Sequence, residues 1–217
     1  ARTVLEFGFG RELGEGVDRM FEGMEEVGLP DPIYRQGPAS VIVTPGSSGA
    51  LVLAFGVLIN PGDEVLMADP GYPCNRHFVR MFEGRARLVP VGPDTGYQLT
   101  AELIRRHWSP RTRAVLISSP SNPTGTLVPD TELAAIVAAV RELGGVLIVD
   151  EIYHGLTYGV EAGTALRHSP DVFVVNSFSK FYGMTGWRVG WLVAPPAYVD
   201  AIDRLAQNVF LATSTPG

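Results

Sequence analysis

Short apolar runs alternate with longer amphipathic segments along the chain from about residue 40 onward. Seven runs rich in β-branched residues predict strands, at residues 41–44, 64–68, 87–91, 114–118, 146–150, 172–177 and 191–194. Five segments between them predict helices, at residues 48–59, 73–83, 100–108, 130–143 and 196–207. Asp130 directly precedes an apolar stripe, which predicts that it caps its helix, and Gly144-Gly145 predicts where that helix ends.

Several of these predicted strands are apolar on both faces, which is typical of strands that helices cover on both sides. The alternation of strands and helices predicts an α/β fold with a mostly parallel sheet. Ligands of such sheets bind beyond the carboxyl ends of the strands. The residues directly after each strand are therefore the candidates for function.

Composition and charge narrow the class of protein. Hydrophobic residues make up 46% of the chain and charged residues 18%, which indicates a globular, well-buried fold. The net charge of −6 argues against a nucleic-acid or membrane-surface partner, and the longest apolar stretch is too short to span a bilayer. The single cysteine, Cys74, fits a reducing, cytoplasmic compartment, and the four histidines lack metal-ligand spacing, so we expect no metal.

The chain contains one lysine, Lys180, three residues after the end of the predicted strand 172–177. Arginine replaces lysine in most surface ion pairs, but it cannot attack a carbonyl, because guanidinium stays protonated in proteins. A lysine kept in an otherwise arginine-only chain therefore indicates amine chemistry. The alternative is an arginine-rich coding bias that leaves one lysine by chance.

Loops after other predicted strands also carry unusual residues. Gly46-Ser47-Ser48-Gly49 opens a predicted helix, where free backbone N–H groups suit an anion, although a serine-capped turn explains it equally. Asn122 lies between two prolines that fix the backbone, although turn chemistry alone explains Asn-Pro. Tyr72 follows the strand at 64–68 and has a side chain that packs or covers a flat ring.

Asp150 ends a buried strand, where a carboxylate needs a cationic or hydrogen-bonding partner. A strand-end acid also occurs in P-loop nucleotide hydrolases, but their Gly-x-x-x-x-Gly-Lys-Ser/Thr loop is absent from this sequence. Ser177, Ser179 and Arg188 surround Lys180 in the sequence, and two hydroxyls with an arginine suit a phosphate ester.

Together these features resemble the pyridoxal-phosphate-dependent aminotransferases of class I/II, the aspartate aminotransferase superfamily of fold type I. The resemblance covers residues from about 41 to the end, with Asp150-x-x-Tyr153 among its elements. It implies a three-layer α/β/α sandwich with a mostly parallel, predominantly seven-stranded sheet. It also implies amino-group transfer between an amino acid and a 2-oxo acid, and a homodimer.

The resemblance also implies roles for individual residues. Lys180, Asp150 and Tyr153 would be catalytic: Lys180 forms a Schiff base with pyridoxal 5'-phosphate and moves the substrate proton, and Asp150 pairs with the ring nitrogen. Asn122 and Tyr153 would bind the ring hydroxyl, and Tyr72 would stack on the ring. The implied phosphate-binding residues are Ser47, Ser48, Gly49, Ser177, Ser179 and Arg188.

The domain organisation departs from the family. Residues 1–37 form an atypical, helix-like N-terminal segment that does not match the family and is weakly similar to helicase-like or DNA-binding regulator proteins. Residues 38–217 are predicted to be the cofactor-binding large domain, truncated before the C-terminal small domain. Three alternatives stay open: a pyridoxal-phosphate-dependent C–S lyase, a non-catalytic aminotransferase-like regulator and an inactive fragment.

Overall fold

The computed structural model describes residues 40–211 and residue 213. Seven strands within this range form one sheet, in the order β1-β7-β6-β5-β4-β2-β3. The strands are β1 (Ser40–Thr44), β2 (Glu64–Asp69), β3 (Arg85–Pro90), β4 (Thr112–Ser118), β5 (Val146–Asp150), β6 (Phe173–Ser177) and β7 (Gly190–Ala194). Neighbouring strands run parallel except where β7 pairs with β1 and β6. All seven predicted strands are confirmed, with ends shifted by at most two residues.

The five predicted helices are also present in the described part of the chain. They are α3 (Gly46–Leu58), α4 (Cys74–Met81), α5 (Ala101–His107), α6 (Asp130–Glu142) and α7 (Val199–Val209). The sequence did not predict three short 3₁₀ turns, η1 (Pro93–Thr95), η2 (Ala165–Arg167) and η3 (Thr185–Trp187), and a fourth, η4 (Pro196–Tyr198), occupies the start of the predicted helix 196–207. A turn of three residues is too short to show a periodic apolar pattern.

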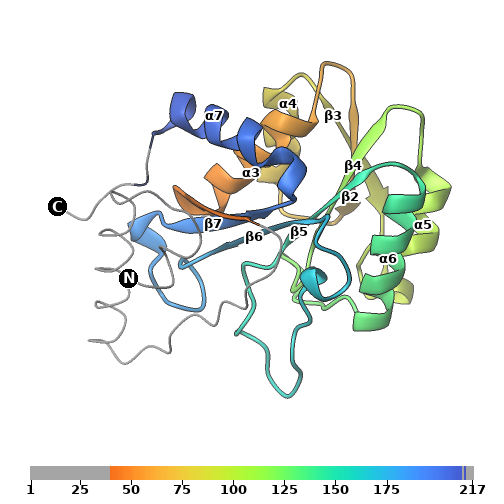
Figure 1. Ribbon diagram of the computed structural model, residues 1–217. Helices are drawn as coiled ribbons and strands as arrows, with labels where there is room; N and C mark the ends of the chain where they lie inside the picture. Colours follow the sequence, from red (N-terminus) through yellow and green to blue (C-terminus); the bar gives the residue numbers. More distant parts are fainter. Residues whose placement is uncertain (1–39, 212, 214–217) are drawn as a thin grey trace.

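Helices cover both faces of the sheet, so the molecule has three layers (Figure 1). On one face, α3, α4 and α7 bury apolar side chains such as Phe55, Val79 and Ile202 against the strands. On the other face, α5 and α6 bury Ile104 and Ile136. The α/β class and the mostly parallel sheet are therefore confirmed. Strands β4 and β5 are buried on both faces, which explains why both read as continuous apolar runs.

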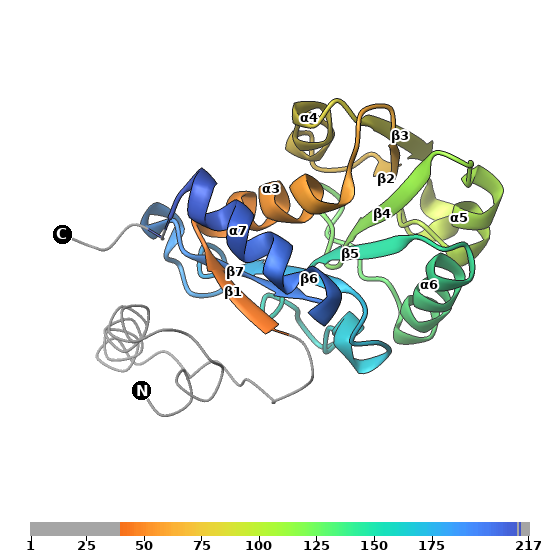
Figure 2. The same cartoon turned by 45° about the horizontal axis from the view of Figure 1, so that its top comes forward.

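The antiparallel strand β7 lies between β1 and β6 and joins the first strand of the sheet to the parallel strands (Figure 2). Ser40 pairs with Ala194, and Ser177 pairs with Gly190. Because β1 is antiparallel to β7 and β7 is antiparallel to β6, β1 and β6 point the same way. The segments that follow these two strands, α3 and the loop that carries Lys180, therefore start from the same edge of the sheet.

One local prediction was wrong, because Asp130 does not cap α6. Pro129 occupies the capping position, Asp130 is the first helical residue, and its Oδ1 lies 3.0 Å from His168 Nε2. An acidic residue in the first turn still interacts favourably with the helix dipole. The predicted end of α6 is confirmed, since Gly144 has φ of +72° and its N–H donates to Arg141 O at 3.0 Å.

The predicted helical segment 1–37 lies outside the described residues. Among the residues that the structure describes, no helix combines the length and the apolar character needed to cross a membrane.

Candidate active site

A cavity of about 220 Å³ opens at the carboxyl edge of the sheet, where the loops after β1, β2, β4, β5 and β6 meet. Nine of the eleven predicted cofactor-binding residues line it. These are Ser47, Ser48, Tyr72, Asn122, Asp150, Tyr153, Ser179, Lys180 and Arg188. The chain thus brings together residues that lie up to 141 positions apart (188 − 47).

Lys180 extends from the loop after β6 toward the end of β5. Its Nζ lies 5.7 Å from the centre of the Tyr153 ring. The Tyr153 hydroxyl is 3.5 Å from Asn122 Nδ2, which comes from the loop after β4. Because β4, β5 and β6 are neighbours in the sheet, their end loops place an amine, a phenol and an amide in one wall of the cavity.

Asp150 also lines the cavity, and its carboxyl group is buried, with only 7% of the residue's surface exposed. Its Oδ1 accepts a hydrogen bond from the Ile152 N–H at 3.1 Å. Burial raises the pKa of Asp150 to about 6, while the Ile152 hydrogen bond and the positive charge of Lys180 act in the opposite direction. The ionised form of Asp150 therefore needs a further cation or proton donor beside it.

The amino end of α3 forms the opposite side of the cavity. The residue before this helix is Pro45, no described side chain caps its free N–H groups, and its first turn contains no acid. The Arg188 guanidinium packs against Gly46 so closely that a Cβ there would lie 2.5 Å from Arg188 Nη2. A Cβ at Gly190 would likewise lie 2.8 Å from Ser47 N. Glycine at 46 and 190 thus permits the helix end and the arginine to meet, and together they form a site for an anion.

Arg188 is fixed by its own backbone. It adopts a left-handed conformation with φ of +54°, and its Nη1 donates to Thr185 O at 3.0 Å. Thr185 in turn donates through Oγ1 to Ser179 O at 2.6 Å. Two hydrogen bonds within residues 179–188 therefore hold this loop in one conformation.

Tyr72, after β2, lines another side of the cavity and leaves 42% of its surface exposed. A hydrogen bond with the Cys74 thiol, together with burial, raises the pKa of Tyr72. The phenol therefore stays protonated at neutral pH, and its ring is free to contact a ligand.

Two predicted residues, Gly49 and Ser177, are not among the described residues that line the cavity. Gly49 is buried in α3, where a Cβ would lie 2.7 Å from Pro45 Cδ. Ser177 is 1% exposed, and its Oγ accepts the Ser179 N–H at 3.1 Å. Gly49 lets the first turn of α3 lie close to Pro45, and Ser177 supports the loop that carries Ser179. A direct contact of either residue with phosphate stays a prediction.

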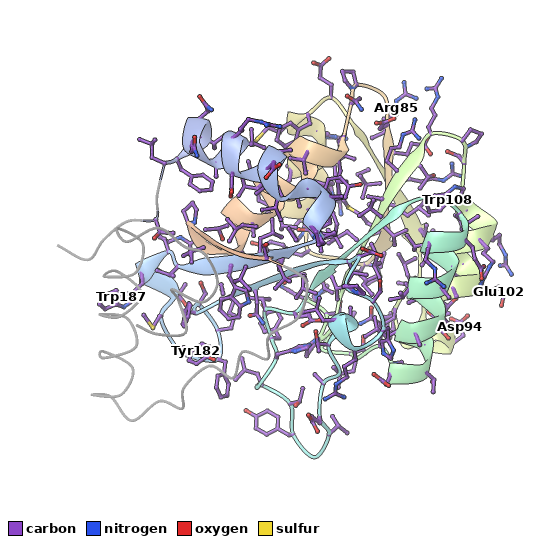
Figure 3. The ribbon with its side chains drawn as sticks, in the orientation of Figure 1. Arg85, Asp94, Glu102, Trp108, Tyr182 and Trp187 are labelled. Atoms are coloured by element: carbon purple, nitrogen blue, oxygen red, sulfur yellow. The ribbon has the colours of Figure 1, made fainter. Side chains whose placement is uncertain are left out.

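Sequence reasoning missed several residues at or beside the cavity. Leu51, Phe78, Ser118, Ile152 and Thr185 also line it. Thr185 had a signal, since it lies three residues before Arg188 in a glycine-containing loop. Tyr182 and Trp187 belong to the same loop region and lie together at one end of the molecule, away from Arg85 and Trp108 (Figure 3).

Comparison with known proteins agrees with this arrangement. The family model described as aminotransferase class I and II matches residues 30–217, so the match begins within the segment 1–37. The valine–pyruvate aminotransferase of Mycobacterium tuberculosis is 44% identical over 173 residues, which are 79% of this chain and 44% of that protein. A probable aspartate/prephenate aminotransferase of Aquifex aeolicus is 33% identical over 92% of this chain and 52% of its own length.

Solved structures give the same result. An aminotransferase from Mycobacterium tuberculosis superposes with a TM-score of 0.80 at 39% identity, over 93% of this chain and 54% of that one. Aspartate aminotransferase of Thermus thermophilus with maleate superposes with a TM-score of 0.77 at 33% identity, over 81% of this chain and 46% of that one. The chain spans about half the length of these relatives. The seven-stranded sheet is that of fold type I, and the chain belongs to the class I and II aminotransferase family.

Proposed function

We propose that this chain forms the cofactor-binding part of a pyridoxal-phosphate-dependent aminotransferase, which moves an amino group between an amino acid and a 2-oxo acid. The observation that supports it most strongly is one cavity that combines a primary amine, a buried carboxyl group and an uncapped helix end with an arginine. The class I and II family depends on pyridoxal phosphate. When bound, this cofactor withdraws electrons from the Cα of an amino acid.

The unpaired groups of the cavity fit that cofactor. Asp150 is a buried carboxyl group whose ionised form needs a cation, and a protonated ring nitrogen is one. The backbone N–H groups at the start of α3 lack a capping side chain among the described residues, and a phosphate satisfies such groups. Each of these features is costly in an empty protein and favourable with the cofactor present.

Each residue would then have a defined task. Ser47, Ser48, Ser179 and Arg188 would hold the phosphate through N–H, hydroxyl and guanidinium donors. Tyr72 would cover one face of the ring. Gly49 and Ser177 would support these groups from behind, as their burial suggests.

The catalytic tasks would fall to three residues. Asp150 would keep the ring nitrogen protonated, and Asn122 with Tyr153 would hold the ring hydroxyl. Lys180 would bind the cofactor's carbonyl carbon and afterwards hold and move the proton at the substrate Cα. A lysine serves both tasks because its amine, unlike guanidinium, is able to lose its proton.

We also propose that the complete protein is a cytoplasmic homodimer that acts without metal or nucleic acid. A single cysteine suits a reducing compartment. Residues 38–217 would form its large domain, followed in the full-length protein by a small domain. Analytical ultracentrifugation of the full-length protein tests the dimer.

Trapping with borohydride tests the proposed function. The protein mixed with pyridoxal phosphate should turn yellow, and borohydride should fix the cofactor carbon covalently to Lys180, as read by peptide mass spectrometry. The matched control is Lys180→Arg, which keeps the positive charge but cannot condense with the aldehyde, so its label should vanish completely. Label on the α-amino group alone, or none at all, would contradict the proposal.

A further inference from the structure

Two ionisable side chains beside the cavity have no task in the proposed chemistry. Glu151 directly follows Asp150, His154 directly follows Tyr153, and neither is among the described residues that line the cavity. The Glu151 side chain is 4% exposed and that of His154 is 20% exposed. Burying two titratable groups is costly unless their hydrogen bonds stabilise something else.

The hydrogen bonds of this pair connect three separate segments. Glu151 Oε1 accepts the Ala165 N–H of η2 at 2.9 Å, and its Oε2 lies 3.5 Å from His154 Nδ1. His154 Nε2 lies 3.1 Å from Ser119 O, at the start of the loop that carries Asn122. The path therefore runs from η2 through the end of β5 to the loop after β4.

The chemistry of these contacts fixes the location of the protons. A carbonyl oxygen only accepts, so His154 Nε2 must carry a proton. A neutral ring then has a bare Nδ1, which faces a carboxyl oxygen of Glu151. At 3.5 Å, this contact is favourable when either the imidazole or the carboxyl group carries a proton and unfavourable when neither does.

The surroundings of the pair favour a proton on Glu151 over a second proton on the His154 ring. Burial raises the pKa of Glu151 to about 7, helped by the negative charge of Asp150 and opposed by hydrogen bonds from Ala165 and Thr164. Burial and the positive charge of Arg167 lower the pKa of His154, and the Ser119 contact opposes them. The Glu151 carboxyl group therefore holds a proton at least as readily as the His154 ring does.

We propose that Glu151 and His154 form a clamp that positions the Asn122 loop against the end of β5. Asn122 Nδ2 is the group 3.5 Å from the Tyr153 hydroxyl, so the clamp sets the distance between the two residues assigned to the ring hydroxyl. Both are positioning residues, because they act through the loop. This inference rests on the proposed function for its effect on the cofactor but not for the clamp itself.

Nitrogen-15 NMR of histidine-labelled protein tests the clamp without any cofactor. From about pH 6 to about pH 8, His154 should keep its proton on Nε2, and comparison with His154→Gln assigns its signal among the four histidines. Glu151→Gln should preserve the Nε2–H form, because the amide still accepts from Ala165 and donates to a bare Nδ1. A His154 with bare Nε2 would overturn the clamp.

Titration with pyridoxal phosphate tests the positioning role. His154→Leu removes the bond to Ser119 and should weaken cofactor affinity about three- to tenfold, whereas His154→Gln should restore most of it through its own N–H. His168→Leu is the matched control, since it breaks a histidine–carboxylate contact of 3.0 Å to Asp130 on the surface of α6 and should leave affinity unchanged. Thermal melts of all three variants check that each is folded.

The outcomes separate the two proposals. If His154→Leu is folded and binds the cofactor as tightly as the wild type, the positioning role is wrong and the proposed function is untouched. If the wild type binds no pyridoxal phosphate, the proposed function fails and the positioning role fails with it. The NMR result still decides whether the clamp exists.

Discussion

Carboxyl groups at the two edges of the sheet have pKa values that are shifted in opposite directions. At the amino edge, Asp63 lies 3.2 Å from Arg113, and Glu64 is bonded to Arg87 at 3.2 Å and to Ser109 at 2.7 Å. The hydrogen bond from Ser109, with the charge of Arg87, lowers the pKa of Glu64. At the carboxyl edge, burial raises the pKa of Asp150 to about 6.

This difference distinguishes carboxylates that stabilise the fold from a carboxylate that is available to a ligand. The carboxylates of the amino edge find their partners within the protein, so their ionised forms stabilise the fold. Among the described residues no cation is in ion-pair contact with Asp150, so its charge costs stability until a ligand supplies a partner. An acid whose pKa is raised inside a cavity is therefore a better sign of function than an ion pair.

Among the proposed substitutions, Asp150→Asn should have the largest effect. Asparagine keeps an acceptor for the Ile152 N–H but carries no charge, so in the complete enzyme we expect turnover to fall on the order of 100-fold, because the ring nitrogen loses its counter-ion. Steady-state kinetics measures this loss, and cofactor affinity should change little. Unchanged turnover would contradict the role of Asp150.

The same variant should have the opposite effect on the cofactor-free fold. The folded pKa of about 6 lies above the ordinary 3.8, so the folded state binds more protons and wild-type stability falls as pH rises from about 4 to about 6. Above that range Asp150→Asn should raise the free energy of unfolding by about 3 kcal/mol, and near pH 4 by nearly nothing. Urea denaturation at both pH values measures the difference, and a loss of stability at high pH would show that the carboxylate is already compensated.

Substitution of one arginine at each edge of the sheet gives the next largest expected difference. Arg188→Gln should weaken binding of pyridoxal phosphate by about 10- to 100-fold, because a charge-assisted bond to phosphate is lost, and should leave binding of pyridoxal unchanged. Arg87→Gln, at the amino edge, should change stability by less than about 1 kcal/mol and affinity not at all. Fluorescence titration with both ligands distinguishes these results, and equal losses for the two ligands would argue against the phosphate contact.

Glu64→Gln should affect only the fold, with a loss of about 1 kcal/mol in the free energy of unfolding near pH 7. The folded pKa of Glu64 is lowered, so its contribution is present above the ordinary 4.5 and disappears as pH falls through the folded value. Glu142→Gln is the control, because that ion pair with Arg105 is exposed on both sides. Equal stability of wild type and Glu64→Gln near pH 7 would contradict the structural role.

The sequence predicted the elements well because their signals are local. The β-branched run of β5 and the apolar stripe of α6 fix those segments without reference to the rest of the chain. The order of the strands and the reversed direction of β7 were not predictable, since they depend on pairing between distant residues such as Ser40 and Ala194. Asp130 was misplaced because Pro129 and Asp130 both suit the start of a helix.

The site was predicted from the positions of residues after strands, and that rule holds because parallel strands end at one edge. Ser177 shows its limit: the serine has the expected place, but its hydroxyl accepts a hydrogen bond from its own loop. Glu151 and His154 were overlooked because their importance depends on contacts with Ala165 and Ser119, which lie 14 and 35 residues away from them.

The antiparallel strand β7 has a consequence for how the molecule can be assembled. The start of α3 and Arg188 become neighbours only when Gly190–Ala194 pairs with Ser40–Thr44. A ribosome must therefore synthesise roughly 150 residues after the first strand before the proposed phosphate site is able to form. A shortened version that stops before Gly190 would lack the strand that pairs with Ser40–Thr44, so the start of α3 would not be held beside Arg188.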